Sequence, residues 1–525
     1  MPDPSACLGR IVAISANNLS CRLDGSGPKV GALVKARTDT ASTVYGVVNR
    51  LELAVDGGAM AVIDLLGEVA DPPSGALPSF QRGVSILPVL GTQLHLAGDG
   101  DYTVVYAKPT RFSVRVGTLC QAPDRPAYLM TDDLLGKHFA VLGTTGSGKS
   151  CAVALTLRAI LEAHPHGHVV MLDPHNEYAQ AFPDMGEVLD ITTIQMPLWL
   201  LDFEESVGVL VRGGTAHEQE SQSAILKEAI LQAKRKYAGE GAESGYITVD
   251  TPVPYRVGDL IRIIDAGMGR LDKPDNSAPY LRLKMRLESL SSDRRFAFMF
   301  SGTIVRDNLA HLLSRILRIP SHGKPLTIID LSGVPSEIVD VLVSMLSRIT
   351  FDFALWGERG SVPPVLLVCE EAHRYIPKDE SGFGSTKRAL SRIAKEGRKY
   401  GVSLCLVSQR PAELSPGILS QCGTLFALRM GNDQDQGFVR AALPENARGM
   451  LDALPALRRQ EAIVVGEGIT VPVRLRFDDL APEHQPRSAG AVFSRAWQEE
   501  AGSAKMIEES VRRWRMQVRR ATEDA

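Results

Sequence analysis

The stretch VLGTTGSGKS, residues 141–150, decides the fold. It contains the pattern G-x-x-x-x-G-K-[ST] in full, which is typical of a loop whose backbone N–H groups hold phosphate. The apolar segment HFAVLG precedes it and a helical pattern follows it, so the loop leads from a strand into the positive end of a helix. We expect Lys149 to reach the outer phosphates and the Ser150 hydroxyl to bind Mg²⁺. The motif predicts these nucleotide-binding residues: Gly143, Thr144, Thr145, Gly146, Ser147, Gly148, Lys149, Ser150 and Cys151.

The composition is that of an ordinary globular protein with more than one domain. The chain has 525 residues, of which 44% are hydrophobic and 23% charged, and its formal net charge is -3. A nucleic-acid partner would therefore need basic residues concentrated in one place. The seven cysteines include no CxxC pair, which favours a reduced, cytoplasmic protein without zinc or disulfides. We expect no membrane-spanning segment, because no run approaches roughly 20 apolar residues.

Residues 1–120 predict a separate all-β domain. Short apolar alternations are interrupted by Gly, Pro, Asp and Asn, a pattern typical of a small β-barrel or sandwich. We predict an N-terminal β-barrel here. The predicted strands are GRIVAIS, VGALVKAR, VYGVVNRLEL, AMAVIDLLGEV, DYTVVYA and FSVRVGTL.

Residues 121–480 predict an α/β domain with a parallel sheet. The apolar strands HVVMLD, LTIIDLSG, PVLLVCEE, VSLCLVSQ and TLFALRM alternate with helical patterns, as in a sheet covered on both faces. Between about 203 and 318 the strand patterns stop and long helical patterns replace them, which predicts a helical insertion. A hairpin is predicted near the end, turning at 466–468, and a polar tail with one helix follows in 481–525.

Two adjacent carboxylates follow the predicted strand at 365–369. Side chains alternate along a strand, so Glu370 and Glu371 are expected to point in different directions. We assign Glu370 to the Mg²⁺ shell and Glu371 to the attacking water, as orienting group or proton acceptor. A second glutamate suits hydrolysis of ATP better than transfer to a bound acceptor, which a simple kinase performs. At least one strand separates the two motifs in sequence, which favours a RecA-like core.

The helical pattern after residue 384 supplies basic groups. Arg388, Arg392, Lys395 and Lys399 follow a 4-3-4 spacing and are predicted to form a basic stripe. Arg398 lies just before the next strand and is a candidate for an arginine supplied in trans to the γ-phosphate of a neighbouring subunit.

Two strand ends add polar groups to the predicted ligand crevice. The strand VSLCLVSQ ends at Gln409, whose side chain is a candidate sensor of the γ-phosphate. The turn DPHNEY follows an earlier strand, so Asp173, His175 and Glu177 are expected near the nucleotide or near a subunit junction.

The segments GTTGSGKS, DPHNEY, CEEAHRY, KEGRKYG and SQRPAEL, in this order, resemble the HerA family of hexameric DNA translocases, relatives of FtsK. The family's usual motifs read DPHGEY and DEAH, so Asn176 replaces a glycine and Glu370 an aspartate. The resemblance implies a homo-hexameric ring that moves double-stranded DNA by hydrolysing ATP with Mg²⁺. It places the trans arginine at Arg398. The segment 378–388 is a candidate pore loop.

The resemblance also implies a partner protein. The N-terminal barrel of the family docks a nuclease such as NurA for DNA end processing, whereas some bacterial relatives pair with a Sir2-like or other effector in antiphage defence. Both hypotheses stay open at the level of the sequence. A secretion or conjugation ATPase is a third hypothesis, and it is disfavoured because such enzymes usually attach to a membrane. A small-molecule kinase is disfavoured by the paired glutamates and by Arg398.

Overall fold

The computed structural model describes most of the chain. The described residues are 7–25, 27–39, 42–55, 57–71, 78–190, 192–239, 245–269, 277–300, 306–358, 360–379, 384–442, 449–487, 494, 497–498 and 502–516. They fall into two compact units. Unit 1 comprises residues 1–165, 368–379 and 394–485, and unit 2 comprises residues 166–367, 380–393 and 486–525.

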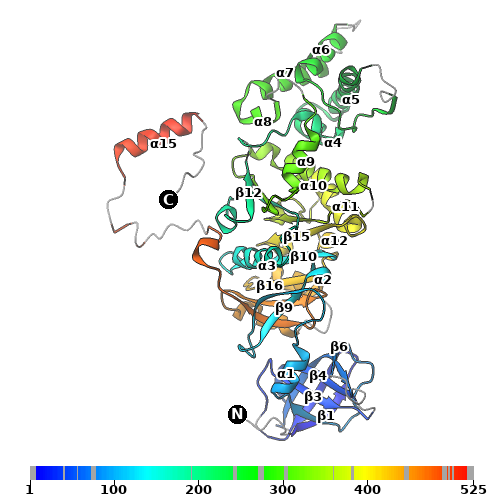
Figure 1. Ribbon diagram of the computed structural model, residues 1–525, viewed down its shortest axis with the longest axis vertical. Helices are drawn as coiled ribbons and strands as arrows, with labels where there is room; N and C mark the ends of the chain where they lie inside the picture. Colours follow the sequence, from blue (N-terminus) through cyan, green and yellow to red (C-terminus); the bar gives the residue numbers. More distant parts are fainter. Residues whose placement is uncertain are drawn as a thin grey trace. The chain divides into compact units, whose positions relative to one another are not determined.

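The N-terminal part of unit 1 is a closed β-barrel, as predicted (Figure 1). Its strands follow the order β2-β1-β7-β3-β4-β5, and β2 also pairs with β5, so six strands close the ring while β6 extends β5. Closure removes exposed sheet edges, and the inward side chains, such as Ile11, Val34 and Ile63, form the core. The strands are β1 (Cys7–Ile14), β2 (Asn18–Leu23), β3 (Leu33–Arg37), β4 (Ser42–Leu53), β5 (Ala59–Ala70), β6 (Phe80–Arg82) and β7 (Gln93–Leu96).

The segment DYTVVYA is helical, so the predicted strand there is wrong. Helix α1 (Asp99–Val105) begins after Gly98, whose N–H donates to the Asp101 side chain over 2.8 Å. Tyr102 and Tyr106 are one helical turn apart, and their rings stack at a centroid distance of 5.9 Å. The segment therefore buries residues at a spacing of three and four, which the local alternation of apolar and polar residues did not reveal.

The rest of unit 1 is built on a mixed sheet. Strands β15, β10 and β16 are parallel neighbours, and β17, β18, β8 and β9 continue the sheet in antiparallel pairs. The predicted strand at 112–119 forms as β8, but it pairs with β18 and β9 and not with the barrel. The strands are β8 (Ser113–Leu119), β9 (Pro126–Met130), β10 (Phe139–Leu142), β15 (Val402–Ser408), β16 (Thr424–Leu428), β17 (Glu461–Gly466) and β18 (Val473–Phe477).

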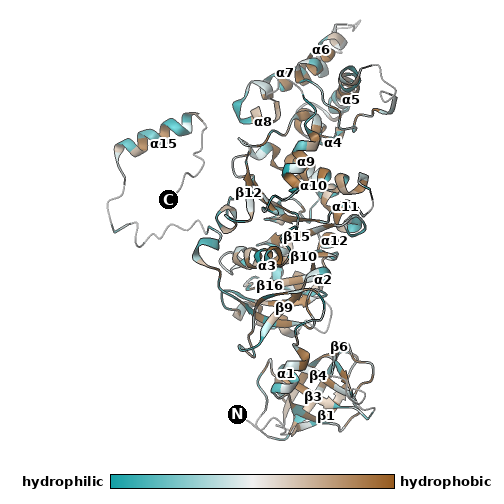
Figure 2. Ribbon diagram, viewed as in Figure 1, coloured by the Kyte–Doolittle hydropathy of each residue, from teal (hydrophilic) through white to brown (hydrophobic). Residues whose placement is uncertain are grey.

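The helices of unit 1 are short except for the one that follows the phosphate loop. Besides α1, those that lie entirely in unit 1 are α2 (Thr131–Leu135), α3 (Lys149–Ala163), α12 (Pro416–Leu419) and α13 (Asp433–Ala442). Every residue of β10, β15 and β16 is buried, and these strands are coloured as hydrophobic in Figure 2. Buried on both faces, they form continuous apolar runs in the sequence, which is why the sequence located them well. The predicted hairpin is confirmed as β17 and β18, joined by residues 467–472.

Unit 2 combines a parallel sheet with a helical insertion. Strand β13 (Leu326–Asp330) lies between β11 (Val169–Asp173) and β12 (Gly186–Leu189), in parallel with both. Strand β14 (Val365–Cys369) starts in unit 2 and ends in unit 1. Among the described residues between β12 and β13 the secondary structure is helical only, so the insertion is confirmed. Its main helices are α4 (Phe203–Leu210), α5 (Ala216–Ala238), α6 (Val257–Met268), α7 (Ala278–Ser292), α8 (Ala297–Phe300) and α9 (Leu309–Leu317).

The remaining helices are α10 (Ser336–Trp356), α11 (Gly384–Tyr400) and α15 (Ala504–Met516). Helix α10 is mostly buried, and its Arg348 makes an ion pair of 2.8 Å with the buried Glu205 of α4. Since a buried carboxylate is costly without a partner, this pair anchors α4 to α10. In the part of the chain that the structure covers, no helix has the length and apolar character that crossing a membrane requires.

The cap of α1 gives a first prediction. Asp101 also accepts hydrogen bonds from Lys35 Nζ at 2.7 Å and Tyr45 OH at 2.8 Å. Burial by itself would raise the pKa of Asp101, but these bonds outweigh it and the net pKa is lowered. Replacing it by alanine should destabilise the barrel by about 1–3 kcal/mol, because three donors, one of them on the buried Tyr45, lose their acceptor.

Hydrogen exchange of residues 99–105 in the full chain measures this loss, and Asp99→Ala, at an exposed position of the same turn, is the matched control. A lowered folded-state pKa means that the stabilisation is present above the ordinary value of 3.8 and is lost as the pH falls through the folded-state pKa. Equal protection in Asp101→Ala and Asp99→Ala would contradict this account of the cap.

Candidate nucleotide-binding and catalytic site

The phosphate loop leads from β10 into α3 and is held by the strands on either side. The Gly143 N–H donates to Ser408 O, at the end of β15, over 3.2 Å. The Thr144 N–H donates to Arg429 O, just after β16, over 3.0 Å. The loop is therefore fixed by the parallel register of three buried strands.

Two glycines give the loop its shape. Gly146 has φ of +76° and Gly148 has φ of +101°, values that side-chain-bearing residues rarely adopt. The first turn of α3 starts immediately after Gly148, so the N-terminus of the helix follows directly on the loop. This is the geometry that binds a phosphate chain.

Lys149 and Ser147 stabilise the loop from within. The Ser147 hydroxyl donates to Thr144 O over 2.7 Å, and Lys149 Nζ donates to the same carbonyl over 3.2 Å. Lys149 is buried, with 8% of its surface exposed, so its ammonium group lies over the loop. Ser150 and Cys151 occupy the first turn of α3 and are half-buried. The motif residues thus form one continuous cradle in unit 1.

The paired carboxylates lie directly after β14, as predicted. Glu370 and Glu371 are 3% and 8% exposed. Glu371 has φ of 52°, in the left-handed region, so the backbone turns sharply between the two carboxylates. A strained non-glycine residue that the surrounding structure holds in place is common at functional sites.

His373, which the sequence did not single out, links Glu371 to β15. Its Nδ1 lies 3.1 Å from the Glu371 carboxylate and 3.2 Å from the Ser408 hydroxyl. Burial lowers the pKa of His373 to about 4, and the nearby Arg410, Arg374 and Lys149 act in the same direction. His373 is therefore neutral at pH 7, and its Nδ1 lies beside both the Glu371 carboxylate and the Ser408 hydroxyl. The histidine was visible in the motif EEAH, but only the fold shows its contact with Ser408.

Gln409 is in direct contact with the phosphate loop. Its side-chain oxygen accepts a hydrogen bond from the Thr145 hydroxyl. The neighbouring Ser408 hydroxyl accepts from the Arg410 N–H over 3.1 Å. The end of β15 thus contacts both the loop and, through His373, Glu371. The structure connects Lys149 and Gln409 through the phosphate loop, and it places Glu371 beside His373, which contacts Ser408.

Arg398 is exposed in the last turn of α11. The predicted basic stripe on this helix stays a prediction, and two of its members form ion pairs within the chain. Arg388 pairs with Glu204 at 3.1 Å, while Arg392 pairs with Asp352 at 3.5 Å and lies 4.5 Å from the centroid of the Phe351 ring. The acidic partners lie on α4 and α10, far from α11 in the sequence, so the spacing of the basic residues could not reveal these contacts. In the segment 378–388, residues 380–383 lie outside the described residues.

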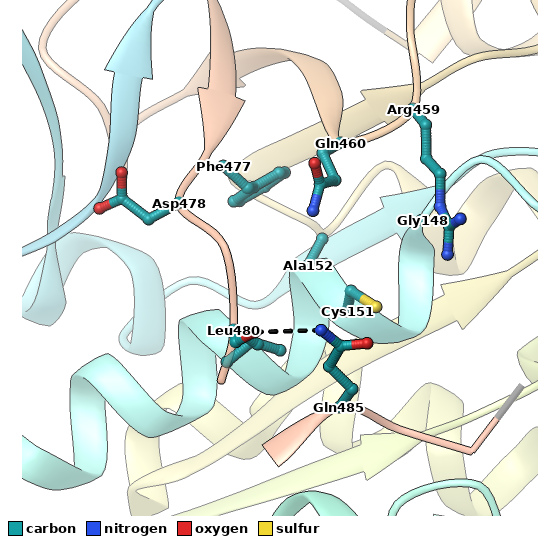
Figure 3. Close-up of a pocket in the computed structure, with 9 residues that line it drawn as sticks. All are labelled: Gly148, Cys151, Ala152, Arg459, Gln460, Phe477, Asp478, Leu480 and Gln485. Carbon is teal, nitrogen blue, oxygen red and sulfur yellow. Dashed lines mark hydrogen bonds between the residues drawn. The ribbon is translucent and has the colours of Figure 1, made fainter. Parts of the chain in front are cut away.

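A pocket opens beside the start of α3. Figure 3 shows Cys151 and Ala152 on the helix, with Arg459, Gln460 and Gln485 around them. The remaining lining residues are Gly148, Phe477, Asp478 and Leu480. The Gln485 amide donates to Leu480 O over 3.1 Å. The pocket adjoins the phosphate loop at Gly148.

The turn DPHNEY belongs to unit 2. Asp173 is buried and accepts from the N–H groups of His175 at 3.1 Å and Tyr178 at 3.0 Å. Burial raises the pKa of Asp173 to about 6, although these two bonds oppose the shift. His175 is exposed and Glu177 is half-buried. Asp173 closes the turn, and the predicted role of the turn at the nucleotide stays a prediction.

Comparison with known proteins agrees with the motifs. Residues 114–350 match the family model described as helicase HerA, central domain. The DNA double-strand break repair helicase HerA of Pyrococcus furiosus is 27% identical over 74% of this chain and 72% of the relative. Its counterpart in Saccharolobus solfataricus is 27% identical over 75% of this chain and 73% of the relative.

Solved structures with a related chain course include VirB4 of Thermoanaerobacter pseudethanolicus, at 18% identity and a TM-score of 0.49, covering 72% of this chain and 98% of that chain. The plasmid coupling protein TrwB in complex with ADP and Mg²⁺ has 14% identity and a TM-score of 0.42, covering 74% of this chain and 96% of that chain.

The fold and the site define a P-loop ATPase, an enzyme that hydrolyses ATP. The sequence matches then identify it further. Residues 114–350 match the HerA central domain, and relatives named HerA match about three quarters of the chain, so the predicted resemblance to the HerA family is confirmed.

The replacement of glycine by Asn176 gives a second prediction. Asn176 has φ of 53°, in the left-handed region, where glycine is favoured and asparagine is the best tolerated side chain. Asn176→Gly should keep the stability, whereas Asn176→Ala should lose about 1–2 kcal/mol. Urea denaturation of the three proteins measures the difference. Equal stability of the alanine and glycine variants would mean that the backbone at 176 relaxes to another conformation.

Proposed function

We propose that the protein is a ring-shaped, ATP-driven translocase of double-stranded DNA that works with a nuclease in DNA end processing. The observation that carries the proposal is the contact of β15 with two sides of the site, through Gln409 to the phosphate loop and through His373 to Glu371. Such a link lets the state of the γ-phosphate reach the sheet, which a motor needs and a simple binding protein does not.

ATP with Mg²⁺ is the proposed ligand. The loop offers N–H groups and Lys149 to the phosphates, and a small pocket adjoins the loop at Gly148. Ser150 and Glu370 would hold Mg²⁺, since it prefers hard oxygen donors and takes few of them from protein when phosphates supply the rest. When bound, the ion neutralises charge on the β- and γ-phosphates.

The residues of the chain divide the hydrolytic work. Glu371, oriented by the neutral His373, positions the attacking water and accepts its proton. Lys149 stabilises the charge on the outer phosphates, and Gln409 moves with the γ-phosphate because it already contacts Thr145 in the loop. Glu371 is buried and held in a strained turn, so its carboxylate stays in one orientation.

Arg398 is proposed to act on the site of a neighbouring subunit in a homo-hexamer. It is exposed, whereas Arg388 and Arg392 of the same helix are bound within the chain. An exposed arginine near the end of a rigid helix suits delivery of a positive charge across a subunit junction. Ring formation would make hydrolysis cooperative.

Double-stranded DNA is proposed as the cargo because the relatives are DNA double-strand break repair helicases. Binding would be to phosphates, and therefore independent of sequence and sensitive to salt. The chain has a net charge of -3, so the contact must use local basic groups such as the exposed Lys395 and Lys399 of α11.

The barrel is proposed to dock the partner protein. Val12, Val89 and Leu90 are 44%, 54% and 65% exposed, and the bond from Gly91 N–H to Ile11 O sets the last two beside β1. A NurA-like nuclease is the first candidate, and a Sir2-like effector of antiphage defence is the alternative. Co-purification with the product of the neighbouring gene separates them. The seven free cysteines fit the proposed cytoplasmic location.

ATP hydrolysis should depend on double-stranded DNA. Lys149→Ala should abolish DNA-stimulated hydrolysis. Glu371→Gln should lower kcat by about 10²–10⁴ while nucleotide binding is kept, because only the proton acceptor is removed. Glu220→Gln, an exposed change on α5, is the control. Wild-type hydrolysis that is indifferent to DNA would contradict the translocase.

The trans role of Arg398 should be visible in mixed rings. Arg398→Ala and Lys149→Ala should each be inactive alone, but together they should regain hydrolysis, because some junctions then combine an intact loop with an intact arginine. Hydrolysis is compared with the sum of the separate variants, at constant total protein. A mixture no better than that sum would remove Arg398 from this role.

A further inference from the structure

His138 lies immediately before β10 and is the hub of a buried hydrogen-bonded junction. Its side chain is within hydrogen-bond distance of two backbone groups on other elements, at 3.1 Å from Ala394 O in α11 and 3.0 Å from the Leu404 N–H in β15. Its own carbonyl accepts from the Gly423 N–H over 3.0 Å, just before β16. One residue thus joins three strands of unit 1 to α11.

The two side-chain bonds fix the state of the imidazole. The Leu404 N–H is a donor, so Nδ1 must accept and carries no proton. Nε2 then carries the proton and donates it to Ala394 O, so the ring is neutral. Burial and the nearby positive charge of Arg398 lower the pKa of His138, which keeps this neutral state.

The bond to Ala394 acts on the turn of α11 that carries Arg398. In an α-helix the carbonyl of residue i accepts a hydrogen bond from the N–H of residue i+4. Ala394 O therefore lies one turn before Arg398, on the same face of the helix. Helix α11 ends at Tyr400, and Gly401 has φ of +77°, so this is the last full turn. An end turn frays unless tertiary contacts hold it.

The backbone of His138 is held in an unfavourable conformation to make these contacts. Its φ is 53°, and only 4% of its surface is exposed. A non-glycine residue in this region persists only where the surrounding contacts outweigh the strain. The contacts that do so here are those to α11, β15 and the start of β16.

We propose that His138 is a positioning residue for Arg398: it sets the last turn of α11 relative to the strand that carries the phosphate loop. This inference rests on the proposed trans role of Arg398. In a ring, β10 would then set the position of the phosphate loop of one site and, through His138, the position of the arginine delivered to the next site.

Two conservative variants separate the bonds. The longer amide side chain in His138→Gln would place a donor near the position of Nε2, so this variant keeps the bond to Ala394 and loses the acceptor for Leu404. The side chain in His138→Asn is shorter, so that variant keeps an acceptor near Nδ1 and loses the bond to Ala394. Asparagine is also the better residue at a φ of 53°, which favours the folding of His138→Asn over that of His138→Gln.

The proposal predicts that His138→Asn loses hydrolysis by about ten- to a hundredfold, as a small misplacement of a catalytic group does. His138→Gln should keep most of the activity although its backbone is more strained. Nucleotide binding should be unchanged in both. His168→Gln is the matched control: His168 also precedes a sheet strand and bonds a helix-end carbonyl, Leu317 O, at 3.0 Å in unit 2, but through Nδ1, so that glutamine is the variant that loses the bond.

Hydrolysis by rings that contain two different variants tests the inference most directly. If His138 acts through Arg398, His138→Asn should regain hydrolysis when mixed with Lys149→Ala, as Arg398→Ala should. If the variant disturbs the phosphate loop of its own chain, the mixture should stay at the sum of its parts, which would overturn the inference. Failure of the Arg398→Ala mixture would instead refute the trans arginine itself. A fully active His138→Asn would also overturn the inference.

Discussion

The parallel register of β10 with β15 and β16 is the constraint on which the site depends. The phosphate loop makes its two anchoring bonds to Ser408 O and Arg429 O, at or just after the ends of those neighbours. A shift of either strand would move the carbonyls and with them the loop. Because all three strands are buried along their whole length, such a shift would expose apolar surface, and the register is therefore fixed.

The same three strands collect the chemistry at one edge. β10 ends at the loop, Gln409 directly follows β15, and Glu371 is connected to β15 through His373. In the proposed ring, a change in the γ-phosphate is felt first by Gln409 and Lys149. The resulting displacement of Gln409 can be transmitted along β15, because the strands of a buried sheet move as a unit. At the other end of β10, His138 contacts the helix that carries Arg398.

Sequence reasoning located most of the site but not its connections. The phosphate loop, the glutamates and the parallel strands were predictable, because each follows a local pattern. The helix at 99–105 was not, since DYTVVYA also alternates as a strand does and only Asp101, Lys35 and Tyr45 together show the cap. The pairing of β8 with β18 and the ion pair of Arg388 each join residues more than 100 positions apart in the sequence. The ion pair of Arg392 joins two separate helices. The roles of His138 and His373 also depend on contacts that only the fold creates.

The central claim is movement along double-stranded DNA driven by ATP hydrolysis. The most direct measurement is displacement of a third strand from a DNA triplex, followed with the wild-type protein and with Glu371→Gln. The account predicts displacement by the wild type that requires ATP and Mg²⁺, and none by the variant. Steady ATP hydrolysis by the wild type on the same DNA without displacement of the strand would contradict it.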